Sequence, residues 1–281
     1  MFKRKALTRF EDWYRSSGHK ALLVKGARQV GKTYLVNAFA HERFENVVVF
    51  DMVEDRAARE SFAAATSADD LFLRMTVAAS APMVPGKTLV FIDEVQLCPN
   101  VVSYIKYLVQ RDGFRYVLSG SLLGVVEIEN VDSLPVGYVD QVEMYPMDFE
   151  EFCWAMGLTE SVWPMACDAA GAGEPLPDFL YGRLLGLFHR YMMVGGMPDA
   201  VSAFVESGNI DRVRAVHGNL HALYRQDITK YAPEGLRLVI RDIYDLIPSE
   251  LGSKNRRFKL SSIQGVKRFA QVTDHFLWLA K

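Results

Sequence analysis

The sequence predicts an α/β protein with a doubly wound parallel sheet, and three observations lead to this prediction. Strand and helix patterns alternate over the first ~145 residues. Residues 26–33 read Gly-Ala-Arg-Gln-Val-Gly-Lys-Thr, which is the G-x-x-x-x-G-K-[ST] pattern of a phosphate-binding loop between a strand and a helix. The apolar run over residues 88–92 ends in Asp93 and Glu94. Ligands bind at the carboxyl ends of the strands in such sheets, so both motifs fall where chemistry is expected.

Short runs of β-branched and apolar residues mark the expected strands, because a parallel sheet covered on both faces needs apolar strands. These runs are Ala21–Lys25, Asn46–Asp51, Thr88–Asp93, Phe114–Ser119 and Val139–Met144. The strand at 46–51 lies between the strand before the phosphate loop and the strand that ends in Asp-Glu. This order is typical of the additional-strand class of P-loop NTPases, in which the glutamate after the metal-binding aspartate is the usual water activator.

Helices are expected wherever apolar residues recur at helical spacing. Between the strands these are the segment directly after the phosphate loop, Asp69–Ala79 and Val101–Gln110. From Met147 onward the pattern is helical only, over Asp148–Met156, Asp178–Met193 and Asp211–Thr229. Residues 157–177 are rich in Pro, Gly and Ala and are expected to form a loop. A final basic module begins near Pro233.

The phosphate loop is the first candidate site. Gly26 and Gly31 allow the backbone to wrap an anion, so that successive N–H groups and a helix N-terminus point at phosphate oxygens. Lys32 is expected to reach the β- and γ-phosphates, and the Thr33 hydroxyl is expected to bind Mg²⁺. The residues predicted to bind nucleotide are Gly26, Ala27, Arg28, Gln29, Val30, Gly31, Lys32 and Thr33. An ordinary Gly-containing turn is the alternative.

The end of the 88–93 strand supplies the second half of the predicted site. Asp93 is expected to hold Mg²⁺, directly or through water, as the Walker-B aspartate does. Glu94 is placed to accept a proton from an attacking water. A solvated strand end is the alternative for an Asp-Glu pair taken alone. Its position after an apolar strand and downstream of a phosphate loop favours the catalytic interpretation.

Composition bounds the class of protein. The 281 residues suffice for two or three domains, and 50% hydrophobic and 23% charged residues are ordinary for a soluble globular chain. No apolar stretch approaches the ~20 residues that span a bilayer. The basic start is followed by Glu11 and Asp12 where a signal peptide would need its apolar segment. Cys98, Cys153 and Cys167 lack metal-ligand spacing, so we expect buried thiols and a cytoplasmic location.

Charge is unevenly distributed along the chain. Between Tyr116 and Gly182 there are twelve acidic residues and no Lys or Arg. From Leu236 to the end there are nine basic and four acidic residues. This asymmetry suggests a separate part that faces a polyanion. The basic patch Lys254, Arg256, Arg257 and Lys259 is the predicted DNA contact, whereas a solvated surface that balances the acidic middle is the alternative.

The order of motifs resembles a family of bacterial and archaeal AAA-superfamily ATPases. The motifs that carry the resemblance are Arg28–Thr33, Phe91–Gln96 with Pro99, Leu118–Ser121, Tyr145–Phe152, Gly195–Asp199 and Tyr224–Ile228. In that family the ATPase core precedes a helical lid, a winged-helix-like module and usually a restriction-endonuclease-like domain of unknown function. The resemblance therefore implies a P-loop NTPase core over 1–145, a lid over 146–233 and a winged-helix-like segment over 234–281. The apolar stretch His275–Lys281 is an abrupt end, so we expect that the last domain is missing.

The resemblance also implies roles for further residues. Ser119 matches the position called sensor 1, where a polar side chain holds the attacking water or the γ-phosphate, and Ser121 is a weaker candidate. The Gly195–Pro198 motif resembles a lid motif that approaches adenine. The relatives often carry Gly-Arg before the fifth strand, but here Gly137 is followed by Tyr138. An arginine finger must then come from elsewhere, from Arg225 or in trans from a neighbouring subunit.

The leading functional interpretation is a Mg²⁺-dependent ATPase that acts as a nucleotide-driven switch or motor and is slow in isolation. Its ligands are ATP, ADP and Mg²⁺, and its catalytic residues are Glu94, Lys32 and Ser119. The absence of an Asn-Lys-x-Asp guanine signature, together with the resemblance, favours adenine. A small-molecule kinase and a nucleotide-gated binding module with negligible turnover are the alternatives.

Overall fold

The structure is a computed structural model that describes residues 2–16, 20–111, 113–121, 135, 137–253, 258–263 and 265–280. It divides into two compact units, Met1–Val213 and Arg214–Lys281, which we describe separately. Among the residues described, no helix is both long and apolar enough to cross a membrane.

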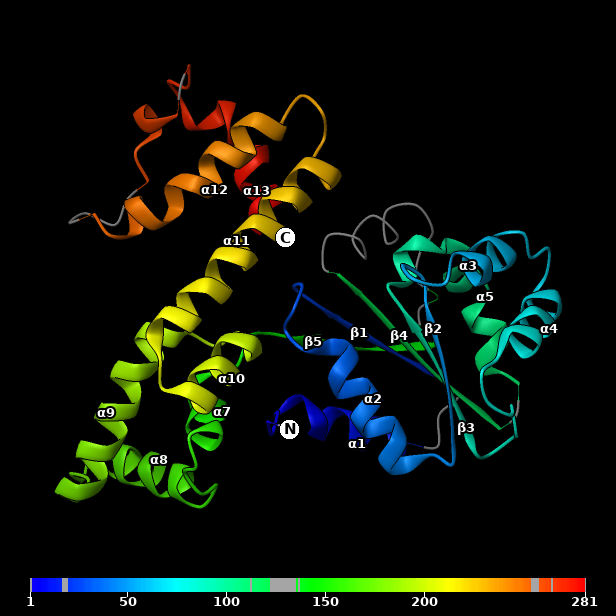
Figure 1. Ribbon diagram of the computed structural model, residues 1–281, viewed down its shortest axis with the longest axis horizontal. Coiled ribbons are helices and arrows are strands. Elements are labelled where there is room, and N and C mark those ends of the chain that lie inside the picture. The colour runs from blue at the N-terminus through cyan, green and yellow to red at the C-terminus, as the bar shows by residue number, and fades with distance from the viewer. Residues whose placement is uncertain are drawn as a thin grey trace. The chain divides into compact units, whose positions relative to one another are not determined.

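The first unit is built on a five-stranded parallel sheet with the order β2-β3-β4-β1-β5 (Figure 1). Its strands are β1 Ala21–Gly26, β2 Asn46–Asp51, β3 Thr88–Asp93, β4 Phe114–Ser121 and β5 Val139–Met144. The five predicted strands are confirmed, with one further residue in β1 and two in β4. This order places β4 between β1 and β3, so the carboxyl ends of these three strands meet at one edge.

Helices cover both faces of the sheet, as the prediction of a doubly wound fold requires (Figure 1). One face packs on α1 Ala6–Arg15 and α2 Lys32–Arg43. The other packs on α3 Arg56–Ala63, α4 Ala68–Ala78 and α5 Pro99–Val109. Successive strand residues face opposite sides of the sheet. Leu23 packs in the core on the side of α3, α4 and α5, whereas Leu22 packs in the core on the side of α1 and α2. All six residues of β3 are buried, which explains its uninterrupted apolar sequence.

The rest of the first unit is helical. It contains α7 Phe149–Ala155, α8 Val162–Ala172, α9 Asp178–Val194 and α10 Pro198–Ser207. The prediction of a loop over 157–177 is wrong for the eleven residues of α8. Pro164 is the third residue of this helix, where no intrahelical N–H bond is needed, and Gly173 ends it in the left-handed conformation at φ 68°. Pro198 likewise begins α10 as its first residue.

The second unit is also helical in its described part. The helix α11 Ile210–Tyr231 leads into it, followed by α12 Arg237–Leu251, two short 3-10 helices (Leu260–Ser262 and Phe269–Gln271) and α13 Thr273–Ala280. Trp278 and Leu279 of α13 pack against the buried cluster around Ile228 and Ile240. No strand occurs among the described residues of 234–281, so the winged-helix-like assignment stays a prediction, as do the proposed domain boundaries.

Candidate active site

The backbone between β1 and α2 has the conformation that the two motif glycines allow. A Cβ at Gly26 would lie 2.2 Å from the carbonyl oxygen of Met144, so only glycine lets β1 and β5 approach this closely. Gly31 has φ 91° and is the N-cap of α2, a left-handed conformation that residues with a Cβ rarely adopt. No side chain among the described residues caps α2. The first N–H groups of this helix are therefore available to an anion.

Lys32 lies inside this loop and is only 6% exposed. Its Nζ donates hydrogen bonds to the carbonyl oxygens of Gly26 and Ala27, both at 2.9 Å. Burial lowers the pKa of Lys32, while the nearby carboxylates Glu94 and Asp93 oppose this shift. The loop thus holds a partly desolvated ammonium group that an entering phosphate would pair with.

Asp93 joins three elements of the site and is 4% exposed at the end of β3. Its Oδ2 accepts a hydrogen bond from Thr33 Oγ1 of α2 at 2.6 Å. Its Oδ1 accepts hydrogen bonds from Ser119 Oγ of β4 and, at 3.0 Å, from the backbone N–H of Glu94. The strand order explains this convergence, because β3 and β4 are neighbours and α2 follows β1. Four of the residues singled out by sequence are brought together at one carboxylate.

Glu94 has an unusual backbone conformation for a residue with a long side chain, with φ 53° and ψ 46°. Such left-handed residues other than glycine are uncommon and cluster at functional sites. Its Oε2 accepts a hydrogen bond of 2.5 Å from Gln96 Nε2. Gln96 orients the carboxylate and was not singled out as a site residue. The only sequence signal for this role is the position of Gln96 two residues after Glu94, in the run Asp-Glu-Val-Gln.

The chemistry of these residues fits Mg²⁺. Thr33 and Asp93 offer a hydroxyl and a carboxylate oxygen that already touch. Within the described part of the chain, no cluster of three or more His, Cys, Asp or Glu is arranged to hold a metal ion. Mg²⁺ does not need such a cluster, since it commonly binds through one or two protein oxygens together with phosphate oxygens and waters.

The Gly195–Pro198 motif lies beside the phosphate loop. A Cβ at Gly196 would lie 2.0 Å from the carbonyl oxygen of Met147, and the Met147 N–H donates to the Gly196 carbonyl at 2.6 Å. Pro198 Cγ lies 3.7 Å from the Cβ position of Gly31. The junction between α9 and α10 is thereby held against both the loop and the segment after β5. This position suits the predicted lid motif, although its approach to adenine stays a prediction.

The remaining candidates are Arg225, the C-terminal cations and Ser121. Arg225 belongs to the second unit, where its Nη2 donates to Asp245 Oδ2 at 2.9 Å. Of the predicted DNA-contacting cations, Lys254, Arg256 and Arg257 lie outside the described residues. Ser121 pairs in register with Gly26 and is buried.

The cysteines correct one expectation. Cys98 and Cys153 are buried, and burial raises the pKa of both thiols, to about 11 for Cys153. Cys167 is an exposed free thiol, so the expectation of a buried thiol is wrong there. Its helix, α8, buries none of its residues.

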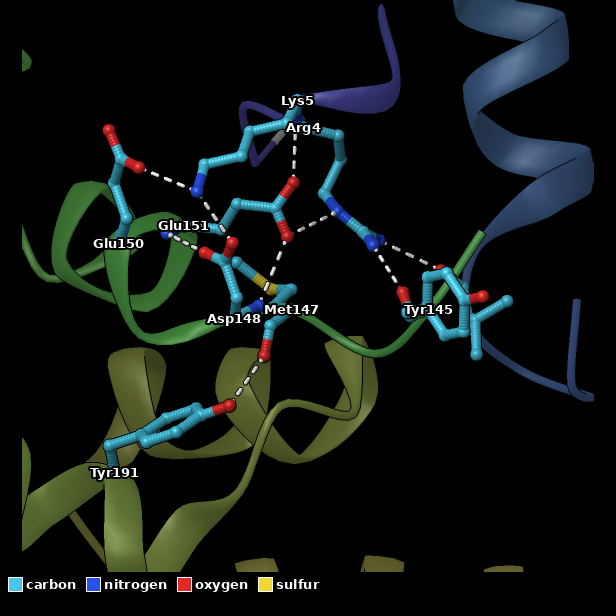
Figure 2. Close-up of polar contacts among 9 residues, drawn as sticks. Arg4, Lys5, Tyr145, Met147, Asp148, Glu150, Glu151 and Tyr191 are labelled. Carbon is cyan, nitrogen blue, oxygen red and sulfur yellow. Dashed lines mark hydrogen bonds and ion pairs between the residues drawn. The ribbon is translucent and has the colours of Figure 1, made fainter. Parts of the chain in front are cut away.

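The N-terminal segment supplies residues near the loop that the sequence analysis did not identify. Arg4 contacts the phosphate loop, the segment after β5 and α7, and Lys5 contacts α7 (Figure 2). In sequence this segment appears only as a basic start. No local pattern connects it with partners more than a hundred residues away.

Comparisons with known proteins agree with this geometry. Residues 18–153 match a family model described as an AAA domain, and residues 185–281 match a domain of unknown function (DUF8612). The chain is similar to the Walker-type ATPase PABY2304 of Pyrococcus abyssi, with a TM-score of 0.54 and 16% identity over 100% of this chain and 89% of that one. At this identity the likeness shows the fold alone.

A second solved structure is less similar. The Orc1 protein of Aeropyrum pernix in complex with DNA gives a TM-score of 0.42 and 13% identity over 98% of this chain and 82% of that one. This similarity is too low to support a conclusion about DNA. The comparison with curated proteins gave no match.

Proposed function

We propose that the chain, in which residues 18–153 match a family model described as an AAA domain, binds Mg-ATP and Mg-ADP through residues 26–33 and Asp93 and hydrolyses ATP. The observation that supports this most strongly is the convergence of Thr33 and Ser119 on the Asp93 carboxylate, next to a buried Lys32. This convergence requires the ends of β3 and β4 and the start of α2 to lie next to one another. An ordinary Gly-containing turn does not require such a convergence.

The loop is suited to the triphosphate. The N–H groups at the start of α2 face an anion without competition from a capping side chain, and the helix dipole favours negative charge there. Lys32 Nζ donates to two carbonyl oxygens, which only partly replace its hydration. A β- or γ-phosphate oxygen would provide the negative charge that the buried ammonium lacks. Bound Mg²⁺ would neutralise charge on the phosphates and would be held by Thr33 and Asp93.

Glu94 is the proposed general base. In hydrolysis a water oxygen forms a bond to the γ-phosphorus, the bond to the bridging oxygen breaks, and Glu94 takes the proton of the water. Gln96 holds the Glu94 side chain by donating to Oε2. Ser119 is the proposed sensor for the γ-phosphate through its hydroxyl, which now donates to Asp93.

We expect slow turnover by the isolated chain, because no Lys or Arg occurs between Tyr116 and Gly182 to act as a finger. P-loop enzymes without their arginine run about 10³–10⁵-fold slower than the completed site. The finger would come from Arg225 or from a neighbouring subunit. The role as a nucleotide-driven switch or motor belongs to this proposal, as does a contact of the basic C-terminal segment with DNA.

Release of phosphate from Mg-ATP under multiple-turnover conditions tests the proposal. Glu94→Gln keeps the shape of the side chain but removes the base, so we expect a loss of about 10²–10⁴-fold in turnover with ATP binding retained. Glu45→Gln is the matched control, because Glu45 pairs with Lys87 in front of β2 and should leave turnover unchanged. A rate per chain that rises with protein concentration would indicate a finger in trans.

Two results would replace the proposal. ATP binding without phosphate release at any protein concentration would indicate a binding module whose output is a conformation. Transfer of the phosphoryl group to an added hydroxyl acceptor in preference to water would indicate a kinase.

A further inference from the structure

Arg4 is a buried cation, only 7% exposed, in the segment that precedes α1. Its Nη1 donates to the carbonyl oxygen of Val30 at 2.8 Å, and its Nη2 donates to the carbonyl oxygen of Tyr145 at 2.6 Å. Its Nε lies 3.3 Å from Glu151 Oε2. Figure 2 shows the guanidinium group of Arg4 in contact with Tyr145 and Glu151. The planar fork of arginine suits this arrangement, because a lysine offers a single charged nitrogen.

The contact with Val30 affects the phosphate loop directly. The carbonyl of Val30 and the N–H of Gly31 belong to one planar peptide group and point in opposite directions. By holding the carbonyl, Arg4 fixes the direction of the Gly31 N–H. Gly31 is the residue at which the loop enters α2, and its backbone is free of the usual restraint of a Cβ. Arg4 Nη1 lies 3.7 Å from the position that this Cβ would occupy.

The contact with Glu151 ties the same guanidinium to the start of α7. Glu151 is buried, and its Oε1 accepts a hydrogen bond of 2.6 Å from the backbone N–H of Lys5. Its Oε2 accepts from the backbone N–H of Asp148 at 3.2 Å, while Asp148 Oδ1 accepts from the N–H of Glu151 at 2.9 Å. This reciprocal capping box begins α7. Glu151 therefore serves the helix and the N-terminal segment at once.

The start of α7 is in turn connected to α9. The Tyr191 hydroxyl donates to the carbonyl oxygen of Met147 at 2.9 Å, one residue before the N-cap Asp148 (Figure 2). Movement of the α7 N-terminus would therefore strain or break this hydrogen bond with α9. Because Arg4 and Glu151 are both buried, separation of this pair would leave two unpaired charges with little access to water.

We propose that Arg4 is a positioning residue that couples the phosphate loop to α7, an inference that rests on the proposed binding of nucleotide by this loop. Arg4 in contact with Glu151 holds the Gly31 N–H in the direction that a phosphate requires. A phosphate on that N–H in turn stabilises Arg4 in contact with Glu151. Coupling between two binding events is reciprocal, so nucleotide protects α7 to the same extent that the pair favours nucleotide.

Two variants of the full chain and one control separate this role from simple packing. Arg4→Lys keeps the charge but loses the fork, and Glu151→Gln keeps the hydrogen-bond acceptor but loses the charge. Lys5→Ala is the control, because Lys5 Nζ contacts Asp148 and Glu150 of the same helix turn, and its side-chain contacts within the described part of the chain do not include the loop. Titration calorimetry with Mg-ADP measures affinity without turnover. Hydrogen exchange of residues 149–155 with and without saturating Mg-ADP measures the protection of α7.

We expect Arg4→Lys to weaken Mg-ADP binding about tenfold, equivalent to ~1.4 kcal/mol, and Lys5→Ala to bind as the wild type does. Saturating Mg-ADP should slow exchange in α7 of the wild type and of Lys5→Ala, and should do so much less in Arg4→Lys and Glu151→Gln. A merely structural role would lower the thermal unfolding temperature of Arg4→Lys and leave its affinity and its nucleotide-dependent protection unchanged. That result would overturn the inference.

The parent proposal can be judged separately with Lys32→Ala. If Mg-ADP binds wild type and Lys32→Ala equally, or binds neither, the proposed function fails and the coupling fails with it. If Lys32→Ala binds weakly while Arg4→Lys binds as the wild type does, the coupling alone is wrong. Should Arg4→Lys fail to fold, Glu151→Gln decides, because unchanged protection of its α7 by Mg-ADP would contradict the coupling.

Discussion

The phosphate loop and the N-terminal contacts of Arg4 lie against each other but are built in opposite ways. The loop consists of consecutive residues, 26–33, between β1 and α2. Arg4, in contrast, contacts Val30, which is 26 positions away in the sequence, and Tyr145, which is 141 positions away. A local motif therefore carries the chemistry, and long-range contacts fix the direction of its backbone. A sequence motif reports the first kind of structure and is silent about the second.

The two buried cations differ in the same way. Lys32 Nζ donates to two carbonyl oxygens, so its charge is solvated but not matched by a hydrogen-bonded anion. Arg4 donates to two carbonyl oxygens and also faces the Glu151 carboxylate. Lys32 is suited to pair with a ligand, whereas the charge of Arg4 is already neutralised by the protein. The expected effects of mutation follow this division.

Two close-packed glycines, Gly26 in the phosphate loop and Gly196 against Met147, give the largest expected loss of stability. A Cβ would lie 2.2 Å from Met144 O at Gly26 and 2.0 Å from Met147 O at Gly196. Because both obstacles are backbone atoms, we expect each substitution by Ala to lower the free energy of unfolding by about 3 kcal/mol. Gly186→Ala in α9 is the control, since nothing lies within 4 Å of its Cβ, and it should gain about 0.5–1 kcal/mol.

Urea unfolding of the three glycine variants measures these differences. Unchanged stability of Gly196→Ala would mean that the close contact with Met147 is not kept in solution. Met147 lies in the sequence between Tyr145 and Glu151, the two partners of Arg4 in this segment. Unchanged stability of Gly26→Ala would contradict the tight pairing of β1 and β5 at the loop.

Ser119→Ala tests how the strand ends hold the metal-binding carboxylate. The variant removes a fully buried hydroxyl that donates to Asp93 Oδ1. Hydrogen bonds to charged groups contribute about 1.5–3 kcal/mol, so we expect a loss of that size in the free energy of unfolding. Turnover should fall as well, because Asp93 is no longer fixed. Ser103→Ala, at an exposed position of α5, serves as the control for removal of a hydroxyl. Equal stability of Ser119→Ala and the wild type would rule out this contact.

The pH dependence of nucleotide binding gives the smallest expected effect. Burial lowers the pKa of Lys32 below its ordinary value of 10.5, so the unfolded chain holds this proton more tightly than the folded chain. As pH rises through the lowered pKa, the cost of the buried ammonium disappears, but the neutral amine no longer attracts phosphate. We therefore expect Mg-ADP affinity to fall a few-fold as pH rises through this lowered pKa, with proton uptake on binding between the pKa of the free chain and the higher pKa of the complex.

Lys32→Arg is the control for this titration, because a guanidinium keeps its charge over the whole range. Its affinity should be nearly flat with pH, whatever its absolute value. Parallel profiles for Lys32→Arg and the wild type would show that another group governs the dependence.

The sequence predicted the sheet and the loop well because both are encoded locally. Apolar β-branched runs mark the strands, and the two glycines with Lys32 and Thr33 mark the loop. The helix α8 could not be recognised in the same way, because Pro164 and Gly171 are typical of loops unless the helix boundaries are known. The role of Arg4 was equally hidden, since its partner Glu151 is brought close only by the path of the chain through β5 to α7.

The most direct test of the account is the affinity of the chain for Mg-ATP before and after removal of the Lys32 ammonium. Titration calorimetry on wild type and Lys32→Ala measures it, with Lys87→Ala as the control for loss of an exposed lysine near the start of β3. We expect Lys32→Ala to bind more than tenfold more weakly, a loss of at least ~1.4 kcal/mol, and Lys87→Ala to bind as the wild type does. Equal affinities of wild type and Lys32→Ala would contradict the assignment of residues 26–33 as the nucleotide site.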